Sequence, residues 1–150
     1  MILRGSAGTG KTTLAGAIVR AMVALKQKLV LLAPTGRAAK VFSQNAGHAA
    51  YTIHRRIYRQ KSAGDLSAFS LNDNLNRDTL FIIDEASMIA NQGYGDSAFG
   101  SGCLLDDLIQ FVYQNSDSNC RMLLIGDKAQ LPPVGEDESP ALIDVHAIAL

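Results

Sequence analysis

The chain has no tryptophan, only two cysteines and four prolines in 150 residues, and no excess of either charge, since Lys plus Arg and Asp plus Glu both total 14. Zero net charge neither supports nor excludes a nucleic-acid partner, but any basic surface must then be local. No apolar run approaches the roughly 18 residues of a membrane span, and the start lacks the design of a secretory signal. Cys103 and Cys120 have no metal-ligand spacing, which indicates free thiols and predicts a cytoplasmic protein without a membrane partner.

What the chain does contain is a phosphate-binding loop. Residues 5–12 read GSAGTGKT and fit the pattern G-x-x-x-x-G-K-[ST] at every fixed position. A short apolar run precedes the loop as the end of a strand, and apolar residues at helical spacing follow it over 13–26. The glycines let backbone N–H groups converge on one anion at a helix start. A glycine-rich turn that binds nothing is the alternative, and the intact motif with its correct flanks disfavours it.

This loop predicts ATP and Mg²⁺ as cofactors. Lys11 would reach the β- and γ-phosphates, and the Thr12 hydroxyl would hold magnesium. The predicted ligands of the ATP phosphates are Gly5, Ala7, Gly8, Thr9, Gly10, Lys11, Thr12 and Thr13.

Strand-like and helix-like segments alternate along the rest of the chain. We expect strands at 29–33, 79–83 and 122–125, and helices at 37–44, 52–59 and 103–114. The polar stretch 60–78 and the glycine-rich stretch 91–102 are expected to be loops. Continuous apolar strands such as 79–83 are typical of a parallel sheet that is covered on both faces. The predicted fold class is therefore α/β, with one mostly parallel sheet and helices on both of its faces.

An acidic pair, Asp84-Glu85, follows the apolar strand expected at 79–83. In a parallel sheet this pair would lie at the carboxyl edge, beside the phosphate loop. Asp84 would hold the magnesium together with Thr12, and Glu85 would act as general base toward the attacking water. Taken alone, such a pair also fits a strand that ends in a solvated acidic turn, and the upstream phosphate loop favours the catalytic interpretation.

A third segment, residues 126–134, follows the last expected strand and contains two prolines that stiffen it. A rigid loop at the carboxyl edge can hold one polar side chain in place, and Gln130 is the candidate. Its amide could donate to a γ-phosphate or orient water. Spacing alone leaves this open against an ordinary proline-containing turn with a solvated Gln130.

Five segments together resemble superfamily 1B helicases of the RecD-like group, in the order of their motifs I, Ia, Ib, II and III. The segments are residues 5–13, 33–39, 52–55, 84–88 and 126–133. The resemblance covers nearly the whole chain. It implies a RecA-like P-loop NTPase fold and an ATP-dependent DNA helicase that translocates on single-stranded DNA, 5′ to 3′ in this group.

The resemblance also implies roles for individual residues. Lys11, Glu85 and Gln130 would be catalytic, Gln130 as the sensor of the γ-phosphate, and Thr12 and Asp84 would bind magnesium. The implied DNA contacts are Pro34, Thr35, Gly36 and Arg37 in motif Ia, and Thr52, His54 and Arg55 in motif Ib.

Two of these DNA contacts have other interpretations when the residues are considered alone. Arg37 also fits a solvated or ion-paired surface arginine. His54 lies close in sequence to Tyr51 and Tyr58, and a histidine near an aromatic ring is more often structural. Contacts to phosphates would make DNA binding strongly dependent on salt and little dependent on sequence.

The motifs IV to VI of these helicases are missing, and with them the second motor domain and its arginine finger. We expect residues 1–150 to be the first RecA-like motor domain of a longer helicase, with the second RecA-like domain of the same protein as partner. Because an arginine finger contributes ~10³- to 10⁵-fold in comparable systems, the isolated chain would be nearly inactive. A small-molecule kinase and a non-catalytic nucleotide-dependent binding module remain as alternatives. Residues 60–78, with only Lys61 and Arg77 as basic residues, make a poor kinase lid.

Overall fold

The computed structural model describes residues 2–4, 11–62, 65–89, 103–126 and 147–149. The centre of the fold is one sheet of six strands in the order β3-β2-β6-β7-β1-β8, in which every pair of neighbours is parallel. The strands are β1 (Ile2–Arg4), β2 (Lys28–Ala33), β3 (Ala50–Thr52), β6 (Thr79–Ile83), β7 (Arg121–Gly126) and β8 (Ala147–Ala149). The central strands β2, β6 and β7 are buried almost throughout, as their continuous apolar sequences predict.

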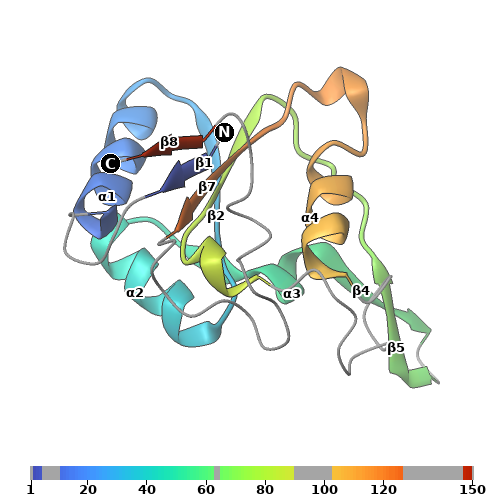
Figure 1. The fold of residues 1–150 in the computed structure, drawn as a ribbon. Coiled ribbons are helices and arrows are strands. Elements are labelled where there is room, and N and C mark those ends of the chain that lie inside the picture. Colours follow the sequence, from blue (N-terminus) through green and yellow to red (C-terminus); the bar gives the residue numbers. More distant parts are fainter. Residues whose placement is uncertain (1, 5–10, 63–64, 90–102, 127–146, 150) are drawn as a thin grey trace.

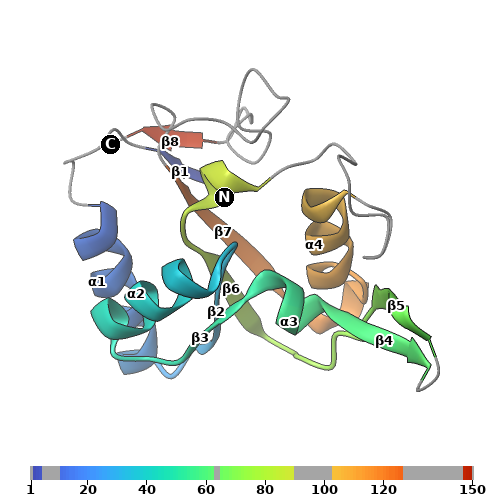
Figure 2. The same cartoon turned by 90° about the horizontal axis from the view of Figure 1, so that it is seen from below.

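Helices cover both faces of this sheet (Figures 1 and 2). On one face lie α1 (Lys11–Ala24) and α2 (Gly36–Ala46), which bury Val19 and Phe42 against Leu31, Ile82 and their neighbours. On the other face lie α3 (Ile53–Ile57) and α4 (Leu104–Val112), where the core is formed by side chains such as Ile53, Ile57, Phe81, Leu108 and Phe111. The predicted α/β class, with a parallel sheet between two helical layers, is therefore confirmed.

The prediction of a loop over residues 60–78 is wrong for its first half. β4 (Tyr58–Ser62) and β5 (Asp65–Leu71) form an antiparallel hairpin that stands beside the main sheet (Figure 1). Ser, Asn and Asp are common in this stretch and pointed to a loop. Phe69 and Leu71, two residues apart on β5, pack against the core beneath α4, and this spacing of two was the available strand signal.

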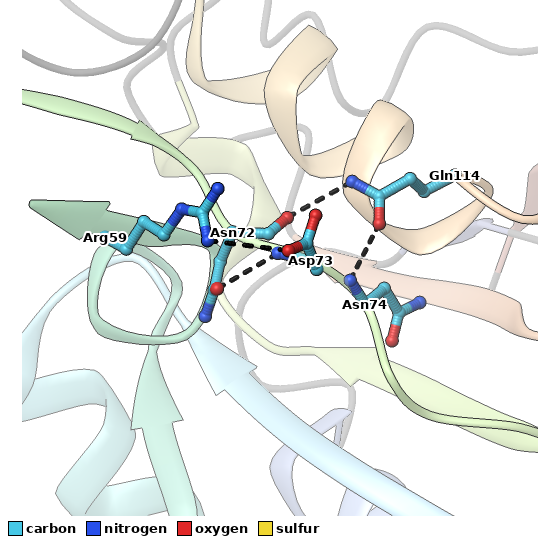
Figure 3. Close-up of polar contacts among 5 residues, drawn as sticks. All are labelled: Arg59, Asn72, Asp73, Asn74 and Gln114. Atoms are coloured by element: carbon cyan, nitrogen blue, oxygen red, sulfur yellow. Dashed lines mark hydrogen bonds and ion pairs between the residues drawn. The ribbon is translucent and has the colours of Figure 1, made fainter. Parts of the chain in front are cut away.

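The root of the hairpin is tied to the end of α4 by one glutamine. The side chain of Gln114 donates to the carbonyl oxygen of Asn72 at 3.2 Å and accepts from the backbone N–H of Asn74 at 2.8 Å (Figure 3). Arg59 on β4 pairs with Asp73 at 3.5 Å, with both side chains exposed. The buried Asn74 side chain in turn donates to the carbonyl oxygen of Val112. These bonds fix the direction in which the hairpin leaves the domain.

Other expected elements differ in their ends. The structure adds β3 and β8, which the sequence did not predict because each has only three residues. The expected helix at 52–59 contains a helix only over Ile53–Ile57, since Tyr58 already begins β4. Two short 3₁₀ helices, η1 (Ala86–Met88) and η2 (Ser116–Ser118), follow β6 and α4. None of the described helices has the length and apolar character needed to cross a membrane.

Candidate nucleotide and strand-binding site

The carboxyl ends of β1, β7 and β6 bring the candidate nucleotide residues to one edge of the sheet. Lys11 and Thr12 are the first two residues of α1, which follows β1 through the phosphate-loop sequence. Asp84 directly follows β6. Because β7 lies between β1 and β6, and neighbouring strands are about 4.8 Å apart, roughly 10 Å separates the two strands. This gap suits phosphates held by the start of α1 on one side and a metal held by the acidic pair on the other.

The acidic pair has an unusual backbone. Glu85 has φ 54° and ψ 37°, the left-handed conformation that a residue with a Cβ rarely adopts, and its N–H donates to a carboxylate oxygen of Asp84 at 2.9 Å. The N–H of Asp84 donates to the carbonyl oxygen of Leu32 at 3.0 Å, which extends the β2–β6 pairing by one residue. Left-handed backbone at a residue other than glycine costs about 1–2 kcal/mol and concentrates at functional sites. Asp84 is therefore buried and held in place, and Glu85 turns away from the strand direction.

The donor set fits magnesium. Mg²⁺ prefers oxygen ligands and takes one or two from the protein, with phosphates and waters as the rest. Asp84, a residue that is only 9% exposed, offers a carboxylate, and Thr12 is the second residue of α1. In the described part of the chain no cluster of three or more His, Cys, Asp or Glu side chains could hold a metal alone. A magnesium ion here would depend on the phosphates.

The motif Ia residues form the start of α2 at the same edge. Thr35 is the N-cap of this helix, and its side-chain oxygen accepts the N–H of Ala38 at 3.1 Å. One N–H that could have faced a phosphate is therefore already bonded, while the Thr35 hydroxyl can still donate its proton. Arg37 is exposed, Gly36 is exposed and Pro34 is half-buried.

A cleft of about 280 Å³ joins these residues to the acidic pair. It is lined by Thr35, Arg37, Ala38, Val41, Asp84, Glu85 and Met88. Its two polar walls come from motif Ia and from motif II, because β2 and β6 are neighbours in the sheet. Arg37 therefore lines the same cleft as the carboxylate expected to act on ATP. The exposed side chains of Val41 and Met88 in this cleft were not singled out by the sequence.

The motif Ib residues lie around α3, after the edge strand β3. Thr52 is the N-cap of α3, and its side-chain oxygen accepts the N–H of Arg55 at 3.3 Å. The ring of His54 is half-buried and lies 5.6 Å from that of Tyr58, which agrees with a structural role for this histidine. The guanidinium of Arg55 lies 5.6 Å from the centre of the Tyr51 ring. Tyr51 and Tyr58 are close to His54 in the sequence, but no sequence motif indicated that either tyrosine belongs to the site.

Several predicted site residues lie outside what the structure describes. Gly5, Ala7, Gly8, Thr9, Gly10 and Gln130 fall outside the described residues, and only the backbone is described for Lys11 and Thr12. Thr13 is an exposed residue in the first turn of α1. Gln130 follows four residues after the end of β7, the strand that lies between β1 and β6. The structure thus brings together the motif Ia and II residues in one cleft and places motif Ib on the neighbouring strand.

Most of this chain is similar in sequence to known proteins. The profile of a family described as AAA domain matches residues 1–98. The uncharacterized protein MJ1519 of Methanocaldococcus jannaschii is 35% identical over 147 residues, covering 89% of this chain and 11% of that protein. The ATP-dependent RecD2 DNA helicase of Deinococcus radiodurans is 32% identical over 134 residues, covering 89% of this chain and 16% of that protein.

Among solved structures, that of Bacteroides Pif1 bound to ssDNA is similar, with a TM-score of 0.53 and 26% identity. The alignment covers 91% of this chain and 30% of the Pif1 chain, so the sequence spans less than a third of each of these proteins. The family profile covers well over half of the chain, and the parallel sheet with its acidic pair after β6 agrees with it. The chain therefore belongs to the AAA domain family and is a RecA-like motor domain of the superfamily 1B helicase type.

Proposed function

We propose that this chain is the ATP-binding and hydrolysing half of an ATP-dependent DNA helicase that translocates on single-stranded DNA. The observation that carries the proposal is the shared cleft, in which Arg37 of motif Ia and the Asp84-Glu85 pair of motif II line the same hollow. A motor that couples ATP turnover to a strand needs a physical connection between its strand contacts and its catalytic carboxylate, and a shared cleft is a direct one. The relatives named as DNA helicases, and Pif1 as a protein bound to ssDNA, support the same activity.

The nucleotide chemistry assigned to these residues is hydrolysis of the γ-phosphate. Lys11 would neutralise phosphate charge at the start of α1, and the phosphate loop would bind the phosphates through its N–H groups. Thr12 and Asp84 would hold Mg²⁺, which supplies positive charge to the phosphates when bound. Glu85 would accept a proton from the attacking water, and Gln130 would sense the γ-phosphate.

The strand and the second half of the motor are further parts of the proposal. Thr35, Gly36, Arg37, Thr52 and Arg55 would contact the sugar-phosphate backbone from the starts of α2 and α3, with Pro34 and His54 beside them. The second RecA-like domain would close the nucleotide site and supply the arginine finger, as the small share of each relative that this chain spans suggests. The 5′ to 3′ direction follows the family. A cytoplasmic location is proposed because neither Cys103 nor Cys120 forms a disulfide in the described part of the chain.

Steady-state ATP hydrolysis, with and without single-stranded DNA, tests this function. The measurement compares this chain with a longer protein that also contains the second motor domain. We expect strong stimulation by DNA in the longer protein and very slow turnover by this chain alone. If neither protein responds to DNA, the helicase proposal fails and a kinase or a switch has to be considered. Vigorous hydrolysis by this chain alone would contradict the split nucleotide site.

A substitution at Glu85 tests the catalytic assignment in the longer protein. Glu85→Gln should lower hydrolysis by about 10²- to 10⁴-fold, because the amide cannot accept the proton, while ATP binding remains. The control is Asp106→Asn, which alters an exposed carboxylate on α4 and should leave hydrolysis unchanged. Unchanged hydrolysis in the Glu85→Gln variant would remove Glu85 from the mechanism.

A further inference from the structure

Tyr51 is an exposed aromatic side chain next to the proposed strand contacts. Its side chain is 40% exposed, and Tyr113, at the end of α4, is 50% exposed. The other aromatic rings whose burial is described lie in the core or pack against it. Tyr51, on β3, directly precedes Thr52 and is four residues before Arg55 of α3. Of the two exposed tyrosines, Tyr51 is therefore the one at the proposed DNA-binding edge.

The exposure of Tyr51 follows from the sheet topology. Tyr51 is in register with Leu32 of β2, which is fully buried in the core beneath α3 and α4. β3 is the edge strand of the sheet formed by the described residues, and none of the described strands covers its outer side. An edge position leaves the ring partly open to solvent.

Arg55 places a positive charge next to this ring. Its guanidinium carbon is 5.6 Å from the ring centre, within the range of a cation–π contact, and the side chain is exposed. Arg55 also lines a cleft of about 310 Å³ together with Arg56, Asn72, Asn76 and other residues at the hairpin root, including the acidic Asp73. Asp73 pairs with Arg59 at 3.5 Å, so its charge is partly offset. This cleft offers space for a nucleotide unit beside Arg55, and the side chains of Arg56, Asn72 and Asn76 could donate hydrogen bonds to that unit.

We propose that Tyr51 and Arg55 form a stacking site for one base of single-stranded DNA. The base stacks on the exposed ring of Tyr51, and the guanidinium of Arg55 contacts the adjoining phosphate. An aromatic face beside a cation is the combination by which proteins hold single strands, and it accepts any base because every base has a π-face. This inference rests on the proposed function, and it adds a contact to the bases where the motif residues supply contacts to the backbone.

Binding to two strands of equal length separates this stacking from contacts to phosphates. One strand is oligo(dT) and the other has the same sugar-phosphate backbone without bases. We expect this chain to bind oligo(dT) roughly 10-fold more tightly than the abasic strand. Tyr51→Ala should abolish that preference and leave affinity for the abasic strand unchanged. Tyr51→Phe should keep it, since stacking needs the ring and not the hydroxyl.

The control variant is Tyr113→Ala, which removes a similarly exposed ring at the end of α4 and should keep the preference for oligo(dT). Since the sequence contains no tryptophan, Tyr51→Trp creates a single fluorescent reporter. Its emission should be quenched by oligo(dT) and not by the abasic strand. Persistence of the preference in Tyr51→Ala, or equal affinity of the unaltered chain for both strands, overturns the stacking site alone. Absence of salt-sensitive binding to either strand would overturn the proposed function as well.

Discussion

Replacing Tyr58 with phenylalanine should destabilise the domain by breaking a buried hydrogen bond beneath motif Ib. The Tyr58 hydroxyl donates to a carboxyl oxygen of Asp107 at 2.6 Å, and the two residues are 7% and 3% exposed. The bond joins the end of α3 to the first turn of α4. A buried hydrogen bond to a carboxyl group contributes about 1–3 kcal/mol, and Asp107 has at least one further interaction that limits the loss. We therefore expect the free energy of unfolding to fall by about 1–3 kcal/mol.

Urea unfolding followed by far-ultraviolet circular dichroism measures this loss. The midpoint should fall while the dependence of the free energy on urea stays constant, since the folded shape is unchanged. In thermal unfolding the same loss corresponds to roughly 3–10 °C for a domain of this size. Tyr113→Phe is the matched control, because it removes a hydroxyl from an exposed tyrosine and should change stability by less than about 0.5 kcal/mol.

A double-mutant cycle with Asp107→Asn attributes the loss to this pair. Tyr58→Phe should cost less in the Asp107→Asn background than in the unaltered chain, because the bond it removes is already weakened. Additive losses, or a loss at Tyr58 no larger than at Tyr113, would refute the reasoning. The ring of Tyr58 lies 5.6 Å from the ring of His54. The hydrogen bond between Tyr58 and Asp107 therefore also helps to hold α3, the helix of motif Ib, in place.

Two further predictions concern motif Ia. Thr35→Ala should lower the free energy of unfolding by about 1 kcal/mol, because the Ala38 N–H loses the side-chain oxygen that caps α2. Thr35→Ser should keep most of this stability, because its hydroxyl can still cap the helix. Urea unfolding midpoints measure both variants, and the same midpoint for Thr35→Ala and Thr35→Ser would remove the capping argument. Arg37→Gln should weaken DNA binding and reduce the slope of log K against log salt by about 0.7, as expected for one lost phosphate contact to a single strand. The control is Arg121→Gln, which alters an exposed arginine at the amino end of β7 and should leave that slope unchanged. The same slope in both variants would exclude Arg37 as a phosphate contact.

Much of the nucleotide site follows from local sequence. The phosphate-loop pattern needs eight residues in register, and the apolar run ahead of Asp84 predicts both the strand β6 and the placement of the acidic pair at its end. Such features depend on neighbours in the chain and on the rule that parallel strands end at one edge. They were predictable for that reason, and the comparisons agree with the family they indicated.

The hairpin and the edge strands could not be predicted in the same way. β4 is polar and β5 mixes polar with apolar residues, and the two strands pair with each other and pack through Phe69 and Leu71 onto a core built from distant segments. β3 and β8 have three residues each, too few for a periodicity to appear, and exist because β2 and β1 offer them an open edge. Pairing between distant segments decided these elements.

The sequence by itself determined which motifs the chain contains: a phosphate-loop pattern, an acidic pair and segments that resemble the motifs of superfamily 1B helicases, each formed by contiguous residues. Only the tertiary structure decided which of these meet. It placed Arg37 in one cleft with Asp84 and Glu85, because β2 and β6 are neighbours although about fifty residues separate them in the chain. It also gave Glu85 its left-handed backbone and left Tyr51 exposed at the sheet edge beside Arg55. Distances between segments remote in sequence depend on strand order and packing, which no local pattern contains.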